Sequence, residues 1–123
     1  MNHIEYAKEL NSFSYNCYNE ELEFITNETK DRILLGRLYY ALVHFYFSKY
    51  PVLAASYAPS KHETLLQIIM KERSESEARV FKTLKKLREW ADYHPLNQEP
   101  FSLNMKRLFH QVNKIINAKN SLQ

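Results

Sequence analysis

Residues 27–50 read NETKDRILLGRLYYALVHFYFSKY, and this stretch decides the fold. It contains no proline, ends in a run of aromatic side chains and is followed directly by Pro51. Asn27 is a good residue to cap a helix, and Glu28 suits the positive end of the helix dipole. A proline disfavours helical geometry in the residue before it. The sequence therefore predicts one long helix from about residue 27 to Tyr50.

The most apolar part of this helix is too short to cross a membrane. Residues 38–47 include His44 and are bounded by Arg37 and Lys49. They number about half of the roughly 20 residues that a spanning helix needs. No charged-then-apolar signal segment opens the sequence, and a lone cysteine, Cys17, cannot form an internal disulfide. We therefore expect a cytoplasmic protein without a membrane span.

A helix is also expected before this segment, because apolar residues there recur every three or four positions. The members of this stripe are Tyr6, Leu10, Phe13, Cys17, Leu22 and Ile25. The pattern predicts a helix near residues 3–26. Since Cys17 lies in the stripe, we interpret it as a core residue and not as a nucleophile.

Two capping boxes predict helices later in the chain. In a capping box, a serine and a glutamate three residues apart each bond the other's backbone N–H. The pattern occurs at Ser60 and Glu63 and again at Ser74 and Glu77. It predicts a short helix after Ser60 and a longer one after Ser74. Residues 51–60 hold two prolines and are interpreted as a connecting segment.

The longer helix is expected over about residues 75–93, and Pro100 with Ser102 indicates the start of a last helix. The apolar side of that last helix carries Met105, Leu108, Val112 and Ile115. A single glycine argues against an all-β chain with many tight turns. We predict an all-α fold, an antiparallel bundle of about five helices that forms one domain over residues 1–123.

The composition excludes several kinds of site. Glycine-rich phosphate loops need residues without a Cβ atom, and this chain has one glycine. Its five histidines and one cysteine show no pair at metal-ligand spacing. We therefore expect neither a cofactor nor a metal.

The charge is distributed unevenly along the chain. Residues 1–31 carry seven acids and two lysines, which gives a net charge of −5. Since the whole chain has a net charge of +3, residues 32–123 carry +8. Residues 100–123 contain no acid. Such polarity suits a basic face for nucleic acid or an attraction between copies. An ordinary solvated surface is the alternative.

The first of two segments that combine arginine with histidine is Arg37-Leu-Tyr-Tyr-Ala-Leu-Val-His44. Seven residues make almost two helical turns, so Arg37, Tyr40 and His44 share one face. The structural interpretation is a half-buried stripe, in which His44 is a hydrogen-bonded core histidine and Arg37 reaches solvent or an acid.

The second segment is Arg88-Glu-Trp-Ala-Asp-Tyr-His94. Arg88 and Asp92 are four residues apart and can pair on one helix face. His94 precedes a proline and therefore lies at a helix end, where the dipole favours its charged form near neutral pH. The alternative is a structural role for all three residues, as a surface ion pair and a C-terminal cap.

Arginine and histidine without a metal suit the cleavage of RNA by its own 2′-hydroxyl. That reaction needs a base for the hydroxyl proton, an acid for the leaving 5′-oxygen and fixed positive charge around the phosphorane. One arginine and one histidine are too few for both proton transfers, but a two-fold dimer doubles the set. The mechanism therefore predicts a homodimer.

At these two segments the chain resembles the HEPN superfamily of small helical-bundle proteins. The first segment is similar to an early-helix pattern of the family, in which arginine, paired tyrosines, alanine and histidine follow one another. Leu87-Arg88-Glu-Trp-Ala-Asp-Tyr-His94 resembles a later pattern and satisfies the R-x(4–6)-H nuclease motif of the family. The resemblance covers residues 5–118.

The resemblance implies a bundle that dimerises through its motif helices. For active members it implies metal-independent endoribonuclease action in toxin–antitoxin, abortive-infection or CRISPR-linked defence. It would make Arg88 the residue that holds the scissile phosphate, His94 the residue that handles its protons, and Asp92 the residue that orients both. The chain departs from many members at His94, where they have aspartate, and at Glu89, where the motif has asparagine.

Further residues are expected to bind nucleic acid. Lys82, Lys85 and Lys86 share a helix face by their spacing and suit contacts to the phosphate backbone, as do Arg37 and His44. The alternative for the lysines is a solvated helix face. A second functional hypothesis is a non-catalytic module whose aromatic-rich second helix packs on a nucleotidyltransferase or another defence protein. The aromatic residues concerned are Tyr39, Tyr40, Phe45, Tyr46 and Phe47.

Overall fold

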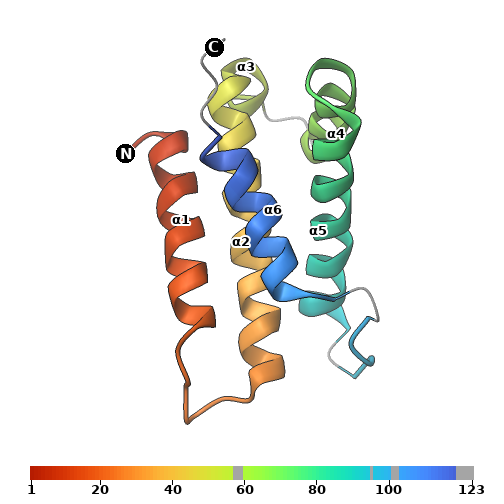
Figure 1. Ribbon diagram of the computed structural model, residues 1–123. Coiled ribbons are helices and arrows are strands. Elements are labelled where there is room, and N and C mark those ends of the chain that lie inside the picture. Colours follow the sequence, from red (N-terminus) through yellow and green to blue (C-terminus); the bar gives the residue numbers. More distant parts are fainter. Residues whose placement is uncertain (57–59, 95, 101–102, 119–123) are drawn as a thin grey trace.

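The computed structural model describes residues 1–56, 60–94, 96–100 and 103–118. All regular secondary structure in these ranges is helical, which confirms the all-α prediction (Figure 1). The helices are α1 (His3–Tyr18), α2 (Asn27–Lys49), α3 (Pro51–Ala54), α4 (Lys61–Glu72), α5 (Glu75–Tyr93) and α6 (Met105–Ile116).

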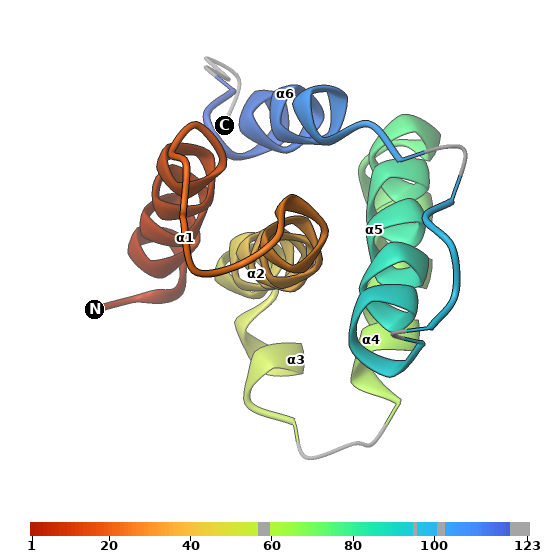
Figure 2. The ribbon, with the colours of Figure 1, turned by 90° about the horizontal axis from the view of Figure 1, so that it is seen from below.

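Helix α2 is the centre of the bundle. Figure 2 shows α1, α6 and α5 arranged around it, with α4 beside α5. Consecutive long helices run in opposite directions, because α1 descends, α2 rises and α5 descends again (Figure 1). On the side of α2 between α1 and α4, Figure 2 shows only the short helix α3. The antiparallel bundle is therefore built around the segment whose sequence decides the fold.

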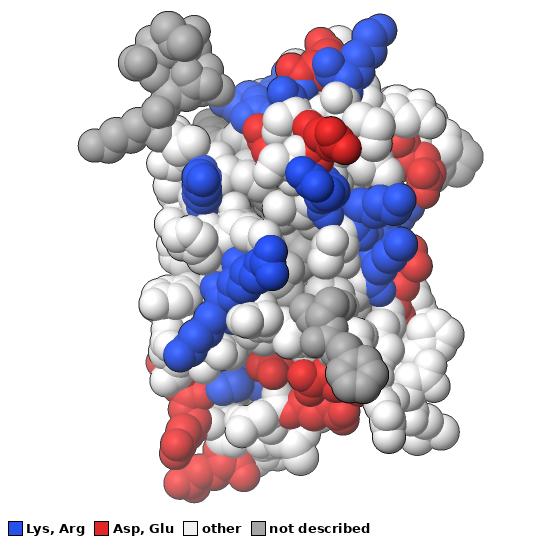
Figure 3. Space-filling view, turned by 45° about the vertical axis from the view of Figure 1, so that its right-hand side comes forward, with Lys and Arg blue, Asp and Glu red and all other residues white. Residues whose placement is uncertain are grey.

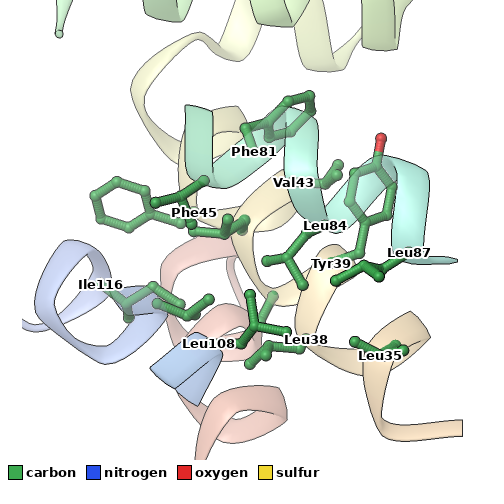
Figure 4. Packing of buried hydrophobic residues seen from close by; sticks show 14 of the residues in the cluster. Leu35, Leu38, Tyr39, Val43, Phe45, Phe81, Leu84, Leu87, Leu108 and Ile116 are labelled. Carbon is green, nitrogen blue, oxygen red and sulfur yellow. The ribbon is translucent and has the colours of Figure 1, made fainter. Parts of the chain in front are cut away.

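The core explains why α2 is apolar on nearly every side. A helix that packs against neighbours all round must bury side chains all round. Leu35, Leu38 and Tyr39 of α2 are completely buried. They meet side chains of α5 and α6, among them Leu84 and Leu108 (Figure 4). Although α2 is 23 residues long, neither it nor any other described helix combines the length and apolar character that crossing a bilayer requires.

The aromatic run of α2 belongs to this core. Tyr39, Phe45, Tyr46 and Phe47 are all buried, and Tyr40 is half-buried. The hypothesis that this run packs on a partner chain is therefore wrong for those four residues, since their side chains are already covered by the protein itself.

Helix α1 is shorter than predicted and turns a different face inward. It ends at Tyr18, and the predicted apolar stripe is partly outside, with Tyr6 39% and Phe13 57% exposed. The buried positions are instead Ala7, Asn11 and Ser14. Small side chains at spacings of four and three let α1 lie close against α2. Small side chains therefore form the fully buried part of this face, while Leu10 and Cys17 of the predicted stripe pack against the core and stay partly exposed.

Two lysines satisfy carbonyl groups at helix ends. The Lys30 ammonium donates to the carbonyl oxygens of Tyr18 and Glu20, at 3.1 and 2.9 Å, where α1 ends. The Lys61 ammonium donates to the carbonyl oxygens of Ala54 and Ser56, where α3 ends. The last carbonyls of a helix have no partner within it. These contacts therefore help to fix where both helices stop.

The N-terminal caps agree with the sequence in part. Ser74 accepts a hydrogen bond from the backbone N–H of Glu77, which is one half of the predicted capping box. The other half is absent, because the N–H of Ser74 donates to the carbonyl of Ile69. The cap of α2 is Thr26 and not Asn27, which is the first helical residue. Ser60 makes no capping hydrogen bond, so the capping box predicted there is absent. Its backbone is not in the extended conformation that this kind of cap needs.

The segment 51–60, predicted as a connection, begins with the short helix α3. Pro51 occupies the start of this helix, where its missing N–H costs no hydrogen bond. Pro51, one of the two prolines that argued against a helix, therefore marks the boundary between α2 and α3. Residues 57–59 lie outside the described residues, as does Ser102 of the predicted last-helix start; α6 begins at Met105 with Asn104 as its cap.

Gly36 lies inside α2 and faces open space. A Cβ atom placed there meets nothing within 4 Å, and the backbone has no positive φ angle. Alanine costs less conformational entropy than glycine in a helix. We expect Gly36→Ala to raise the free energy of unfolding by about 0.5 to 1 kcal/mol, measured by urea unfolding. A loss of stability would show that this position contacts something in the folded protein.

Candidate functional site

Of the residues in the second motif, Arg88 has side-chain contacts both within α5 and to α2. It lies on α5 and its Nε atom is 3.2 Å from Oδ2 of Asp92, so the predicted ion pair is present. Its guanidinium carbon is 5.7 Å from the ring centre of Tyr39 and 5.2 Å from that of Tyr40. Cation–π attraction and the ion pair thus hold the guanidinium at the surface of α2.

Tyr40 is where the two motif segments meet. It belongs to the Arg37-to-His44 segment, and the Arg88 guanidinium packs over its ring. The other members of that segment do not join this contact. Arg37 is exposed, and His44 faces α1. The structure therefore brings one tyrosine, and not the predicted Arg37–His44 pair, to Arg88.

His94 is held by its backbone, and its ring is exposed. Its N–H donates to the carbonyl of Trp90, and its own carbonyl accepts from Arg32. This is the predicted position at the C-terminal end of α5. No hydrogen bond within the described ranges joins its ring to Arg88 or Asp92. A single copy of the chain therefore does not assemble the arginine and histidine of the motif into one contact.

Arg32 is a buried residue that the sequence analysis missed. It comes from α2, and its guanidinium carbon lies 3.9 Å from the ring centre of Trp90. One terminal nitrogen is within 3.1 to 3.3 Å of the carbonyls of Trp90, Ala91 and His94. The other donates to the carbonyl of Asn97 at 3.1 Å. Arg32 thereby caps the C-terminus of α5 and fixes the turn that presents His94.

His62 is the second residue that the sequence analysis missed. Its Nδ1 atom lies 2.7 Å from the hydroxyl oxygen of the buried Tyr39. Its ring also packs near Tyr40, at 6.2 Å between ring centres. Burial lowers the pKa of His62, and the positive charges of Arg88, Lys85 and Lys61 lower it further. His62 is therefore neutral at pH 7 and lies beside the same two tyrosines as Arg88.

His44 pairs with a second histidine. Its Nδ1 atom is 2.8 Å from Nδ1 of His3, and the two rings are stacked. The edge of Tyr6 packs against the His44 ring as well. Burial lowers the pKa of His44, and the neighbouring His3 lowers it further. These contacts match the structural interpretation of His44, as a hydrogen-bonded histidine that joins α1 to α2.

The lowered pKa values of His44 and His62 predict loss of stability in mild acid. In the unfolded chain both titrate near their ordinary pKa of 6.5, but in the folded protein they take up protons only at lower pH. Unfolding therefore consumes protons below pH 6.5. We expect the free energy of unfolding to be constant just above that pH and to fall towards pH 5, in urea titrations.

A pair of variants checks the source of this slope. His44→Asn should flatten the fall between pH 6.5 and 5, because one of the two groups no longer titrates. His110→Asn should leave the slope as it is, since the side chain of His110 is exposed. Equal slopes in all three proteins would contradict the assignment.

The three predicted lysines do not share one surface. Lys85 turns towards α4 and forms an ion pair with Glu63. Lys82 and Lys86 are exposed, and no ion pair within 4.0 Å involves either of them in the described part of the chain. Because residues four apart lie above one another on a helix, Lys82 and Lys86 form a row on the outer side of α5. We call this pair the outer row; Lys85 is not part of it.

A polar groove lies next to this row, between α5 and α6. It has a volume of about 490 Å³, and none of its lining residues is acidic. Its lining includes Arg79, Thr83 and Gln111, with Arg107 on the opposite side. Figure 3 shows basic side chains over the middle of this face of the molecule and acidic ones at its lower end, its upper end and its right-hand edge. Arg79 and Arg107 were not singled out by the sequence analysis.

A second pocket, of about 610 Å³, lies between α1 and α6. Tyr15, Tyr18 and Phe109 form its aromatic part, and Asn11 and Asn113 face one another in its wall, 3.4 Å apart. It contains no residue of either motif. No group of three or more histidine, cysteine or acidic side chains placed to hold a metal ion occurs among the residues described.

Comparisons with known proteins add no relative: no family model, no curated protein and no solved structure matches this chain.

Proposed function

We propose that the protein is a cytoplasmic, HEPN-like RNA-binding protein that acts in defence, in a toxin–antitoxin, abortive-infection or CRISPR-linked system. The observation that carries RNA binding is the row of unpaired cations beside an acid-free groove. Lys82 and Lys86 continue along α5 from Arg79, which faces Arg107 across the groove. Cations without acidic partners exchange counterions for phosphates on binding, and this drives sequence-independent affinity.

The same proposal includes metal-independent cleavage of the bound RNA. Asp92 forms an ion pair with Arg88, and the rings of Tyr39 and Tyr40 lie under its guanidinium. His94 is exposed at the end of the same helix. Because the two side chains make no contact within one copy, cleavage needs a homodimer that brings His94 of one copy near Arg88 of the other.

RNA binding is tested by charge reversal on the outer row. We expect Lys82→Glu with Lys86→Glu to weaken binding of a mixed single-stranded RNA by at least about tenfold at moderate salt, and to reduce the salt dependence of binding. The measurement is fluorescence anisotropy over a series of salt concentrations. The matched control is Lys71→Glu with Lys8→Glu, which makes the same change in net charge at exposed positions on other helices. Equal losses in both proteins would contradict a specific RNA surface.

Cleavage is tested in EDTA with the same RNA. The wild-type protein should cut it, and His94→Ala should reduce the rate by at least about a hundredfold, the usual contribution of a proton-transfer group. A sedimentation measurement on the same samples reports whether the protein is a dimer. Binding without cleavage by either protein would leave an RNA-binding protein that is not an enzyme.

The alternative function, a helical module for a nucleotidyltransferase or another defence protein, has one favourable observation. Ile33 is 51% exposed on α2, next to the exposed Arg37 one turn later. These residues, and not the buried aromatic run, would then contact the partner. An Ile33→Glu variant that keeps RNA binding but no longer joins the partner would favour this reading.

A further inference from the structure

We infer that Arg88 and His62 together bind a phosphate group, at the edge of the Tyr39 and Tyr40 rings between α4 and α5. His62 has no role in the function proposed above. If the phosphate belongs to RNA, the inference rests on that proposed function, whereas a site for free phosphate does not.

The guanidinium of Arg88 has donors left over. Its Nε atom is buried and lies 3.2 Å from Oδ2 of Asp92, an ion pair without a hydrogen bond. Neither terminal nitrogen makes a hydrogen bond to a described residue, and neither is among the buried atoms that lack a partner. Both are therefore open to solvent. Two parallel N–H groups on a fixed guanidinium match two oxygens of a phosphate.

The ring of His62 presents one more donor. The Tyr39 hydroxyl makes no other hydrogen bond within the described ranges. A buried hydroxyl that only accepted would leave its own proton unpaired, so we assign the hydroxyl as the donor and Nδ1 of His62 as the acceptor. The proton of the neutral imidazole is then on Nε2. Nε2 has no partner in the described residues and is not one of the buried atoms without a partner, so it too is open to solvent.

Tyr39 and Tyr40 hold the two groups together. The Arg88 guanidinium packs over both rings, and the His62 ring packs against both. Tyr39 is completely buried, and this burial raises its pKa and keeps its hydroxyl protonated. The hydroxyl therefore remains a donor to His62, and the two ligand groups are fixed to one rigid support.

The surroundings favour an anion. The positive charges of Arg88 and Lys85 on α5 and of Lys61 on α4 all lower the pKa of His62. The nearby acids are engaged, Glu63 with Lys85 and Asp92 with Arg88. The exposed Glu89, also on α5, raises the pKa of Tyr39 by its negative charge. A tetrahedral oxyanion with several acceptors uses these donors better than a planar carboxylate does.

The first test follows the imidazole nitrogens by nuclear magnetic resonance in the full-length protein. Inorganic phosphate and a short DNA oligonucleotide, which lacks the 2′-hydroxyl and is not cut, serve as separate probes. We expect each to shift the Nε2 resonance of His62 while the Nδ1 resonance keeps its hydrogen-bonded position. Acetate at the same ionic strength should shift it much less. An Nε2 resonance that responds equally to all three additions overturns the inference.

Two variants separate binding from packing. His62→Gln places an amide near the former Nε2 position, and His62→Asn places one near Nδ1, where it still reaches Tyr39. If His62 contacts phosphate, His62→Asn should weaken phosphate binding about tenfold, the cost of one hydrogen bond to a charged group, and His62→Gln clearly less. A purely structural role predicts the reverse order, which would overturn the inference. Thermal unfolding confirms that both variants fold.

The outcomes distinguish this inference from the proposed function. If phosphate shifts His62 but RNA does not bind, the phosphate site is supported and the proposed function fails. If RNA binds through Lys82 and Lys86 without any response from His62, the proposed function stands and the inference is overturned. If only the oligonucleotide shifts His62, the source of the phosphate is nucleic acid, and the inference is supported for RNA.

Discussion

Replacing Arg32 with methionine is expected to lower the free energy of unfolding by about 3 to 4 kcal/mol. The change removes hydrogen bonds to four carbonyl groups around the end of α5 and the stacking on Trp90. Methionine fills most of the space, so the loss reflects the cap and not a large cavity. Urea unfolding at pH 7 measures it.

Arg32→Lys is the matched control for this prediction. Lysine keeps the positive charge near the negative end of the α5 dipole, but a single ammonium cannot reach the carbonyls of both His94 and Asn97 in the way that the guanidinium fork does. We expect about half of the loss seen with methionine. A methionine variant as stable as the wild type would show that the C-terminal cap contributes nothing.

Replacing Phe81 with alanine is expected to lower the free energy of unfolding by about 3 to 5 kcal/mol. Phe81 is completely buried on α5, and its ring packs against the rings of Tyr39 and Tyr46. Truncation removes apolar burial and leaves a cavity between two large aromatic residues that have little room to collapse. Urea unfolding measures the change. Because the Phe81 ring contacts the Tyr39 ring, the packing of Tyr39 is disturbed as well.

Phe13→Ala is the contrasting change, because it deletes the same ring from a position that the sequence pattern placed in the core. Phe13 is 57% exposed on α1. We expect its loss to change stability by no more than about 0.5 kcal/mol. Similar losses in Phe13→Ala and Phe81→Ala would mean that the predicted stripe of α1 is buried after all.

Local patterns predicted the long helices well. The start of α5 follows from Ser74 and Glu77, which are three residues apart, and the end of α2 follows from the nearby Pro51. The extent of α1 was wrong, because its spacing of large apolar residues continues past Tyr18. Its true end depends on Lys30, which reaches back from α2 to the last carbonyls. The spacing of apolar residues within one helix cannot predict a contact between two helices.

The candidate site divides in the same way. The Arg88–Asp92 pair spans one helical turn and was predicted from spacing alone. His62 was missed because its partner Tyr39 lies 23 positions away, on another helix. Arg32 left a weak signal, since it occupies the same buried stripe of α2 as Leu35 and Tyr39, where a charge needs partners.

The amino-acid sequence by itself determined that the chain is helical, that one long helix runs from residue 27 to about residue 50, and that Arg88 and Asp92 can pair, because each depends on neighbours within a turn or two. Only the tertiary structure decided that small residues form the inner face of α1, that Arg32 caps α5 and that His62 lies beside Arg88. Those features depend on which helices pack together, and the packing is set by the burial of the whole core and not by any one segment.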